Sequence, residues 1–89
     1  MDSSSIPSHP TSTPDDIAHF RHVITGNHGQ TLTVEVVSLV DDGQASPPIL
    51  TTWGNLDMTP DQALELVDAL TRARAAYKVA LKVYWESLR

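Results

Sequence analysis

The 89-residue chain contains no cysteine, so disulfide bonds cannot stabilise it. A domain of this size buries only about 60% of the surface that its unfolded chain exposes. Small chains often make up for a small core by binding metal or by forming oligomers. The absence of cysteine also fits a reducing compartment.

Long apolar segments are missing as well. No run of about 18 apolar residues is present, which argues against a membrane-spanning helix. The first five residues, Met1 to Ser5, are polar and acidic and no apolar stretch follows them, unlike a secretory signal. We therefore expect a cytoplasmic protein.

Basic residues are scarce: six Lys and Arg stand against eleven Asp and Glu, for a net charge of -5. This balance disfavours nonspecific binding of nucleic acid by the whole molecule. The charge is divided unevenly, because residues 1–70 hold one basic and ten acidic residues and residues 71–89 hold five basic and one acidic. The chain is thus acidic with a basic C-terminal end.

Residues 1–16 consist mostly of Ser, Thr, Pro and Asp. Such a composition buries too little apolar surface to offset the loss of chain entropy. We predict that 1–16 is a disordered tail and that 17–89 forms a single domain.

Three segments are predicted as strands: 18–25, 31–40 and 49–53. In the first two, apolar and polar residues alternate, but in 31–40 the alternation changes phase at Val37, which a bulge or a strand passing an edge would explain. Gly26 to Gly29 and Asp41 to Gly43 are typical of tight turns. Because the connections are short, an antiparallel meander is the simplest pairing.

A long helix follows. Thr59 can act as the N-cap, Pro60 suits the first helical position and Gln62 completes a capping box. Neither Gly nor Pro occurs from there to Arg89, so the helix would be roughly 45 Å long, against about 20 Å for a strand of six residues. Residues 77–85 also alternate with a strand period, but no turn signal in 71–77 separates them from the helix. The predicted class is α+β, a three-stranded antiparallel meander followed by one long C-terminal helix (βββα).

The helix presents several surfaces. At 100° per residue, one stripe should cover the sheet; it contains Leu66, Leu70, Ala73, Tyr77, Leu81, Tyr84 and Leu88. Val79 and Val83 lie beyond this stripe, so the C-terminal half is apolar on more than one face. A helix that projects past its sheet needs another surface to cover such residues, and a twofold dimer is the commonest solution. The predicted protein interface comprises Tyr77, Val79, Leu81, Val83, Tyr84, Trp85 and Leu88.

An adjacent stripe carries Arg74, Lys78, Lys82 and Arg89, with Trp85 among them. It is typical of a solvated face whose cations suit the negative end of the helix dipole. An acidic protein partner is the next interpretation, followed by nucleic acid or a membrane surface. The acidic remainder of the chain would repel phosphate and anionic lipid, and would attract the basic stripe of a second copy.

No combination of residues indicates catalysis. His19 and His22 would point to opposite faces of a strand, His9 lies in the tail and His28 in a turn, so no metal site is predicted. The pairs Asp15-Asp16 and Asp41-Asp42 border the tail and form a turn, not a cleft. The glycines at 26 and 29 link two strands and lack the context of a phosphate-binding loop. We therefore expect no enzyme activity, no cofactor and no small-molecule substrate.

Trp53 is predicted to belong to the core, packed against the first turns of the helix near Leu64 and Val67. The stretch from Trp53 to Leu70, Trp-Gly-Asn-Leu-Asp-Met-Thr-Pro-Asp-Gln-Ala-Leu-Glu-Leu-Val-Asp-Ala-Leu, resembles small uncharacterised actinobacterial and actinophage proteins. These place a Thr-Pro-acid-Gln-Ala helix start after a strand. The resemblance covers about a fifth of the chain and implies a source among such proteins but no function.

These observations predict a non-enzymatic protein-protein interaction module. It would use its C-terminal helix to associate with itself or to join a larger assembly as a small subunit. One alternative is a small regulator that contacts nucleic acid through the basic stripe, and another is a phage-type inhibitor that binds one host protein.

Overall fold

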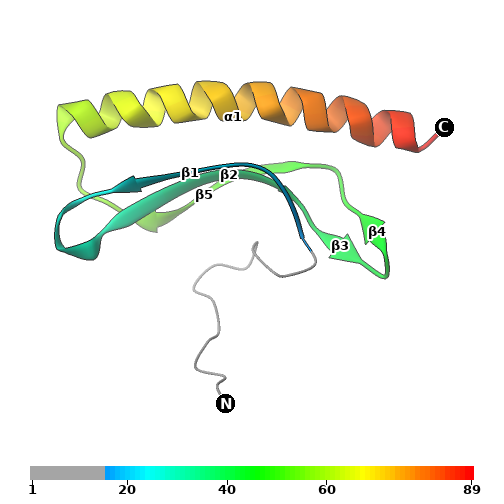
Figure 1. Ribbon diagram of the computed structural model, residues 1–89, viewed down its shortest axis with the longest axis horizontal. Helices are drawn as coiled ribbons and strands as arrows, with labels where there is room; N and C mark the ends of the chain where they lie inside the picture. Colours follow the sequence, from blue (N-terminus) through cyan, green and yellow to red (C-terminus); the bar gives the residue numbers. More distant parts are fainter. Residues whose placement is uncertain (1–15) are drawn as a thin grey trace, which may run out of the picture.

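The computed structural model describes residues 16–89. The predicted disordered tail, apart from Asp16, lies outside the described residues. The described part has the predicted α+β organisation, with antiparallel strands followed by one C-terminal helix (Figure 1). In chain order the elements are β1 (Ile17–Thr25), η2 (Asn27–Gly29), β2 (Thr31–Ser38), β3 (Val40–Asp41), β4 (Gln44–Ala45), β5 (Ile49–Asn55) and α1 (Pro60–Ser87).

The main sheet has the order β1-β2-β5 and is antiparallel throughout, which confirms the predicted meander. The predicted number of strands was wrong, because β3 and β4 form a separate two-stranded hairpin between β2 and β5. Asp42 and Gly43, at its tip, have φ angles of 53° and 76°. Two consecutive positive φ values are typical of a type I′ turn, whose twist suits a tight hairpin.

Strand β2 occupies the centre of the sheet, and its residues 33–38 are all buried. Its pairing with β5 runs without a shift of register, so a bulge, one of the two explanations offered for 31–40, was wrong; the segment instead leaves the main sheet after Ser38 and enters the second sheet at Val40. Val37, where the alternation changes phase, is buried on the sheet face opposite Val34 and Val36. The register shift in the sheet lies instead in β1, between Ala18 and Phe20.

Helix α1 begins as predicted. The Thr59 Oγ1 accepts a hydrogen bond from the Gln62 backbone N–H at 3.2 Å, and the Gln62 Oε1 accepts one from the Thr59 N–H at 2.9 Å. The Gln62 amide also donates to the Thr25 carbonyl at 3.2 Å, which ties the first turn of the helix to the end of β1. Residues 77–85 are helical, so the alternative strand is excluded.

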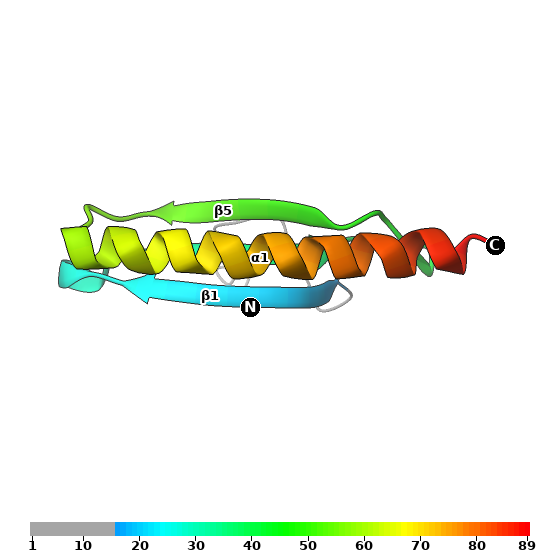
Figure 2. The same ribbon diagram turned by 90° about the horizontal axis from the view of Figure 1, so that it is seen from above.

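The helix lies over one face of the sheet, with β1 along one side and β5 along the other (Figure 2). Val34 and Val36 of β2 form the buried core with Ala69 and Ala73 of α1. The larger side chains packed around this centre are Phe20, Leu66 and Tyr77.

Alanines thus occupy the middle of the helix-sheet contact, and the predicted stripe was wrong at its margins. Ala69, Ala73 and Ala80 are buried, whereas Leu70 and Leu88 are exposed. A small side chain lets the helix backbone come close to the central strand, so the bulkier residues of the stripe lie beside the contact.

The helix is longer than the strands beneath it, as predicted. Its 28 residues span about 42 Å, whereas the nine residues of β1 span about 30 Å. The last turns of α1 therefore extend beyond the ends of β1 and β5 (Figures 1 and 2).

Trp53 does not lie where the sequence predicted. It pairs with Thr33 in the register of β2 and β5, on the sheet face turned away from the helix. Its Nε1 donates to Oε1 of Glu35 at 3.1 Å, and the Arg21 guanidinium lies 6.0 Å from the centre of the indole. Leu64 and Val67, the predicted neighbours of Trp53, remain exposed. The register of the strands decides which face of the sheet Trp53 occupies, and the sequence did not reveal that register.

Candidate interaction surface

The predicted interface residues fall into two groups. Tyr77, Leu81 and Tyr84 are half-buried, and Tyr77 packs against the core. Four others are more than half exposed: Val79, Val83, Trp85 and Leu88. The structure therefore brings part of the predicted set to the core and leaves the rest accessible.

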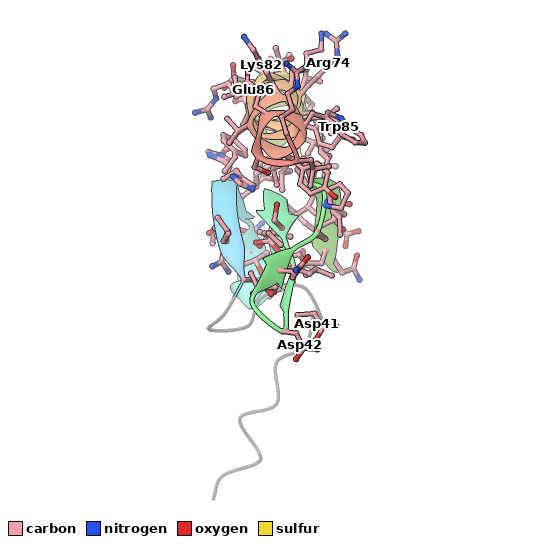
Figure 3. All side chains as sticks on the ribbon, turned by 90° about the vertical axis from the view of Figure 1, so that its right-hand side faces the viewer. Asp41, Asp42, Arg74, Lys82, Trp85 and Glu86 are labelled. Carbon is pink, nitrogen blue, oxygen red and sulfur yellow. The ribbon has the colours of Figure 1, made fainter. Side chains whose placement is uncertain are left out.

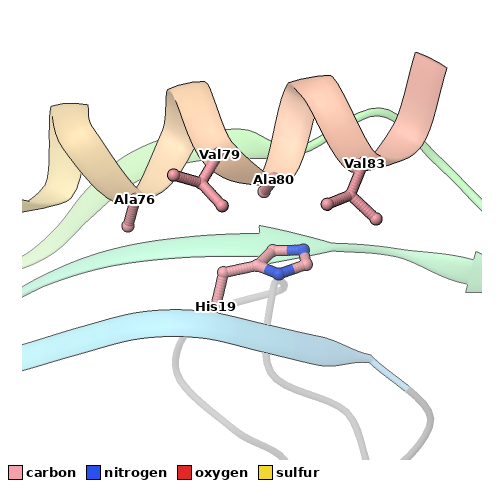
Figure 4. A pocket seen from close by; sticks show the side chains of 5 residues that line it. All are labelled: His19, Ala76, Val79, Ala80 and Val83. Atoms are coloured by element: carbon pink, nitrogen blue, oxygen red, sulfur yellow. The ribbon is translucent and has the colours of Figure 1, made fainter. Parts of the chain in front are cut away.

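Val79 and Val83 form one wall of a groove of about 330 Å³ between α1 and β1 (Figure 4). Ala76 and Ala80 complete the helical wall, and the ring of His19 lies across from them. A second hollow of about 140 Å³ shares His19, Ala80 and Val83 with the first and extends it toward Ile17 and Ser38. The groove thus follows the C-terminal half of the helix.

His19 was not predicted as part of this surface. The irregularity between Ala18 and Phe20 turns it toward the helix, so that it lines the groove. His22 also faces α1, since its Nε2 lies 2.6 Å from Oε2 of Glu65. The prediction that the two histidines face opposite sides was wrong, because one extra residue changes the alternation of a strand.

The His19 Nε2 lies 2.9 Å from the Ser38 Oγ. Ser38 is buried, so its hydroxyl contacts the imidazole from the side of the sheet. The imidazole of His19 is therefore a polar group at the base of an otherwise apolar groove.

Farther toward its N-terminus, the same side of the helix is polar. Arg72 Nε bonds Oδ2 of Asp68 at 3.0 Å, and its guanidinium lies 5.6 Å from the Phe20 ring centre and 3.5 Å from Nδ1 of His22. Together with the pair of His22 and Glu65, these contacts hold the first half of α1 against β1. Val79 and Val83 follow these charged residues along the helix, and Glu86 comes after the valines on the same side.

The basic stripe lies on another side of the helix. Arg74, Lys78, Lys82 and Arg89 are exposed, and within residues 16–89 none of them forms an ion pair. Arg74 and Lys82 point away from the sheet, and Trp85 lies on the β5 side (Figure 3). The stripe is thus separate from the groove.

Of the acidic residues considered above, Asp16, Asp41 and Asp42 lie within the described part of the chain, and none of them lines the groove. Asp16 Oδ1 accepts a hydrogen bond from the Val40 N–H at 3.4 Å, and Asp41 and Asp42 are exposed on the β3-β4 hairpin (Figure 3). Among the described residues, no group of three or more His, Cys, Asp or Glu side chains is placed to hold a metal ion. No helix in the same part of the chain has the length and apolar character needed to cross a membrane.

Comparison with protein-family models, with curated proteins and with solved structures finds no match to this chain.

Proposed function

We propose that the protein is a non-enzymatic interaction module that binds another protein chain through the C-terminal half of α1. The observation that carries this proposal is the exposure of Val79 and Val83, at 65% and 59%, on the wall of an apolar groove. Fully burying an exposed valine contributes about 1.5 kcal/mol or more, so two neighbouring valines and their groove provide a substantial driving force for association.

The distribution along the helix supports the same proposal. In the first half of α1, the side of the helix above β1 carries Glu65 and Asp68, which suit solvent, and Arg72 follows them. In the second half, the same side carries Val79 and Val83 along the groove, and Glu86 follows them. A merely solvated helix face would have no reason to change from charged to apolar where the groove opens.

The proposal is tested with the double variant Val79→Asp/Val83→Asp. Sedimentation equilibrium should show a smaller mass than for the unaltered protein, or loss of a bound partner, while circular dichroism remains unchanged. The matched control is Leu64→Asp/Val67→Asp, because these residues are equally exposed, at 69% and 60%, but lie in the other half of the helix. If both double variants behave alike, the C-terminal half has no special role.

The exposed cations favour a second candidate, a small regulator that contacts nucleic acid through Arg74, Lys78, Lys82 and Arg89. Phosphate contacts weaken steeply with added salt, whereas an interface of valines changes little. Lys78→Glu/Lys82→Glu should leave the assembled mass unaltered if the groove is the binding surface. Binding of nucleic acid that disappears in this variant and in salt would favour the regulator.

A further inference from the structure

In α1, one charged residue lies seven positions before Val79 and another lies seven positions after it. Arg72, Val79 and Glu86 each differ by two helical turns and therefore share one side of the helix. That side faces β1, since Arg72 contacts His22 and Phe20 and Val79 lines the groove with His19. We call it the β1 flank.

We propose that the β1 flank pairs with the β1 flank of a second copy of this chain, antiparallel, with the twofold axis at Val79. This inference rests on the proposed function and names its partner. In an antiparallel pair, a residue that precedes the axis by a given number of positions faces the residue that follows it by the same number on the other helix.

Charge complementarity selects this arrangement. Arg72 precedes Val79 by seven residues and Glu86 follows it by seven, so Arg72 faces the partner's Glu86 and Glu86 faces the partner's Arg72. Each pair lies about 10.5 Å from the axis along the helix. A parallel pair would instead place arginine against arginine and glutamate against glutamate, which is repulsive.

The sizes of the side chains agree with the same register. Val79 meets the partner's Val79 on the axis, and Val83, four residues later, faces the partner's Ala75, with Ala76 beside it. A large residue thus meets a small one on each side of the axis, which lets two helices approach closely. The groove beside His19 then receives apolar side chains in place of water.

Reversing the charges tests the register. Arg72→Glu and Glu86→Arg, each alone, set like charges against each other in both symmetric pairs and should weaken self-association about tenfold. An equal mixture of the two variant chains restores opposite charges at both ends and should associate as tightly as the unaltered protein, as measured by sedimentation velocity. Arg74→Glu, the same change on the outer side of the helix, is the matched control and should leave the association unchanged.

A crosslinking experiment keeps the inference testable if loss of Arg72 disturbs its contacts with β1. Because the chain has no cysteine, Val79→Cys introduces one thiol, and two thiols on the axis should form a disulfide dimer within minutes of adding a mild oxidant. Leu64→Cys, equally exposed at 69% against 65%, should crosslink at least tenfold more slowly.

The results of these experiments distinguish failure of the antiparallel register from failure of the second copy as the partner. If Val79→Asp/Val83→Asp reduces the mass but the mixed variants do not recover, the C-terminal half binds a second copy in some other register and the antiparallel pairing is wrong. If the unaltered protein stays monomeric at millimolar concentration and the two cysteine variants crosslink equally, the second copy is excluded as the partner. The proposed function then depends on a different protein chain.

Discussion

The substitutions Val34→Ala and Val79→Ala distinguish a residue that stabilises the core of the protomer from a residue that is exposed on the helix. Val34 is fully buried against Ala69 and Ala73, whereas Val79 is 65% exposed. Truncating Val34 removes two buried methyl groups and leaves a cavity, at a cost of about 2–3 kcal/mol. The stability of a domain of this size is about 4–11 kcal/mol, and 1 kcal/mol corresponds to about 4–8 °C in Tm. Val34→Ala should therefore lower Tm by about 10–20 °C.

Val79→Ala should act only through association. In dilute protein, the loss of an exposed valine changes stability by less than about 0.5 kcal/mol, so Tm should stay within about 3 °C of the unaltered protein. At high concentration a second copy stabilises the folded state by mass action, so the Tm of the unaltered protein should rise and that of Val79→Ala should rise less.

Thermal unfolding followed by circular dichroism, at about 5 µM and about 500 µM, measures both effects. Val34→Ala should show the same loss at each concentration, since its cost lies within one protomer. A large loss for Val79→Ala in dilute protein would show that Val79 packs inside the protomer and would refute the interface. A Tm of the unaltered protein that does not depend on concentration would refute self-association.

Two further pairs of substitutions test the local structure. Thr59→Ala should destabilise the protein by about 1 kcal/mol in urea unfolding, because it removes the acceptor for the Gln62 N–H, and Thr59→Ser should retain most of the stability. Gly54→Ala should lower the free energy of unfolding by about 1 kcal/mol or more beyond the effect of Gly43→Ala. Both glycines have positive φ, but a Cβ at Gly54 would lie 2.3 Å from the Thr31 carbonyl oxygen, whereas a Cβ at Gly43 would meet nothing within 4 Å.

Features set by neighbouring residues were predictable from the sequence. Thr59 and Gln62 form their capping box within one helical turn, and Asp42 and Gly43 determine the hairpin turn through their own backbone angles. Both depend on interactions that span a few residues, and the sequence displays these directly.

Features set by pairing between distant segments were not predictable. The face of Trp53 depends on its alignment with Thr33, twenty positions away in the sequence. His19 reaches the groove only because β1 is irregular between Ala18 and Phe20, which the alternation of side chains does not reveal. The groove therefore could not be predicted from the sequence, although Val79 and Val83, which line it, were predicted as interface residues.

The position of the alanines explains why these valines form a surface at all. A stripe centred on Leu70, Tyr77 and Leu81 would place Val79 and Val83 on the back of the helix, as isolated apolar residues in water. In the structure the contact is centred on Ala69, Ala73 and Ala80, so the helix is turned about its axis and both valines lie beside His19. The small residues that let α1 approach β2 thus also bring Val79 and Val83 together at the rim of one groove. The surface proposed for association is a consequence of how the core packs, so replacing a central alanine with a larger residue should disturb the groove and the core together.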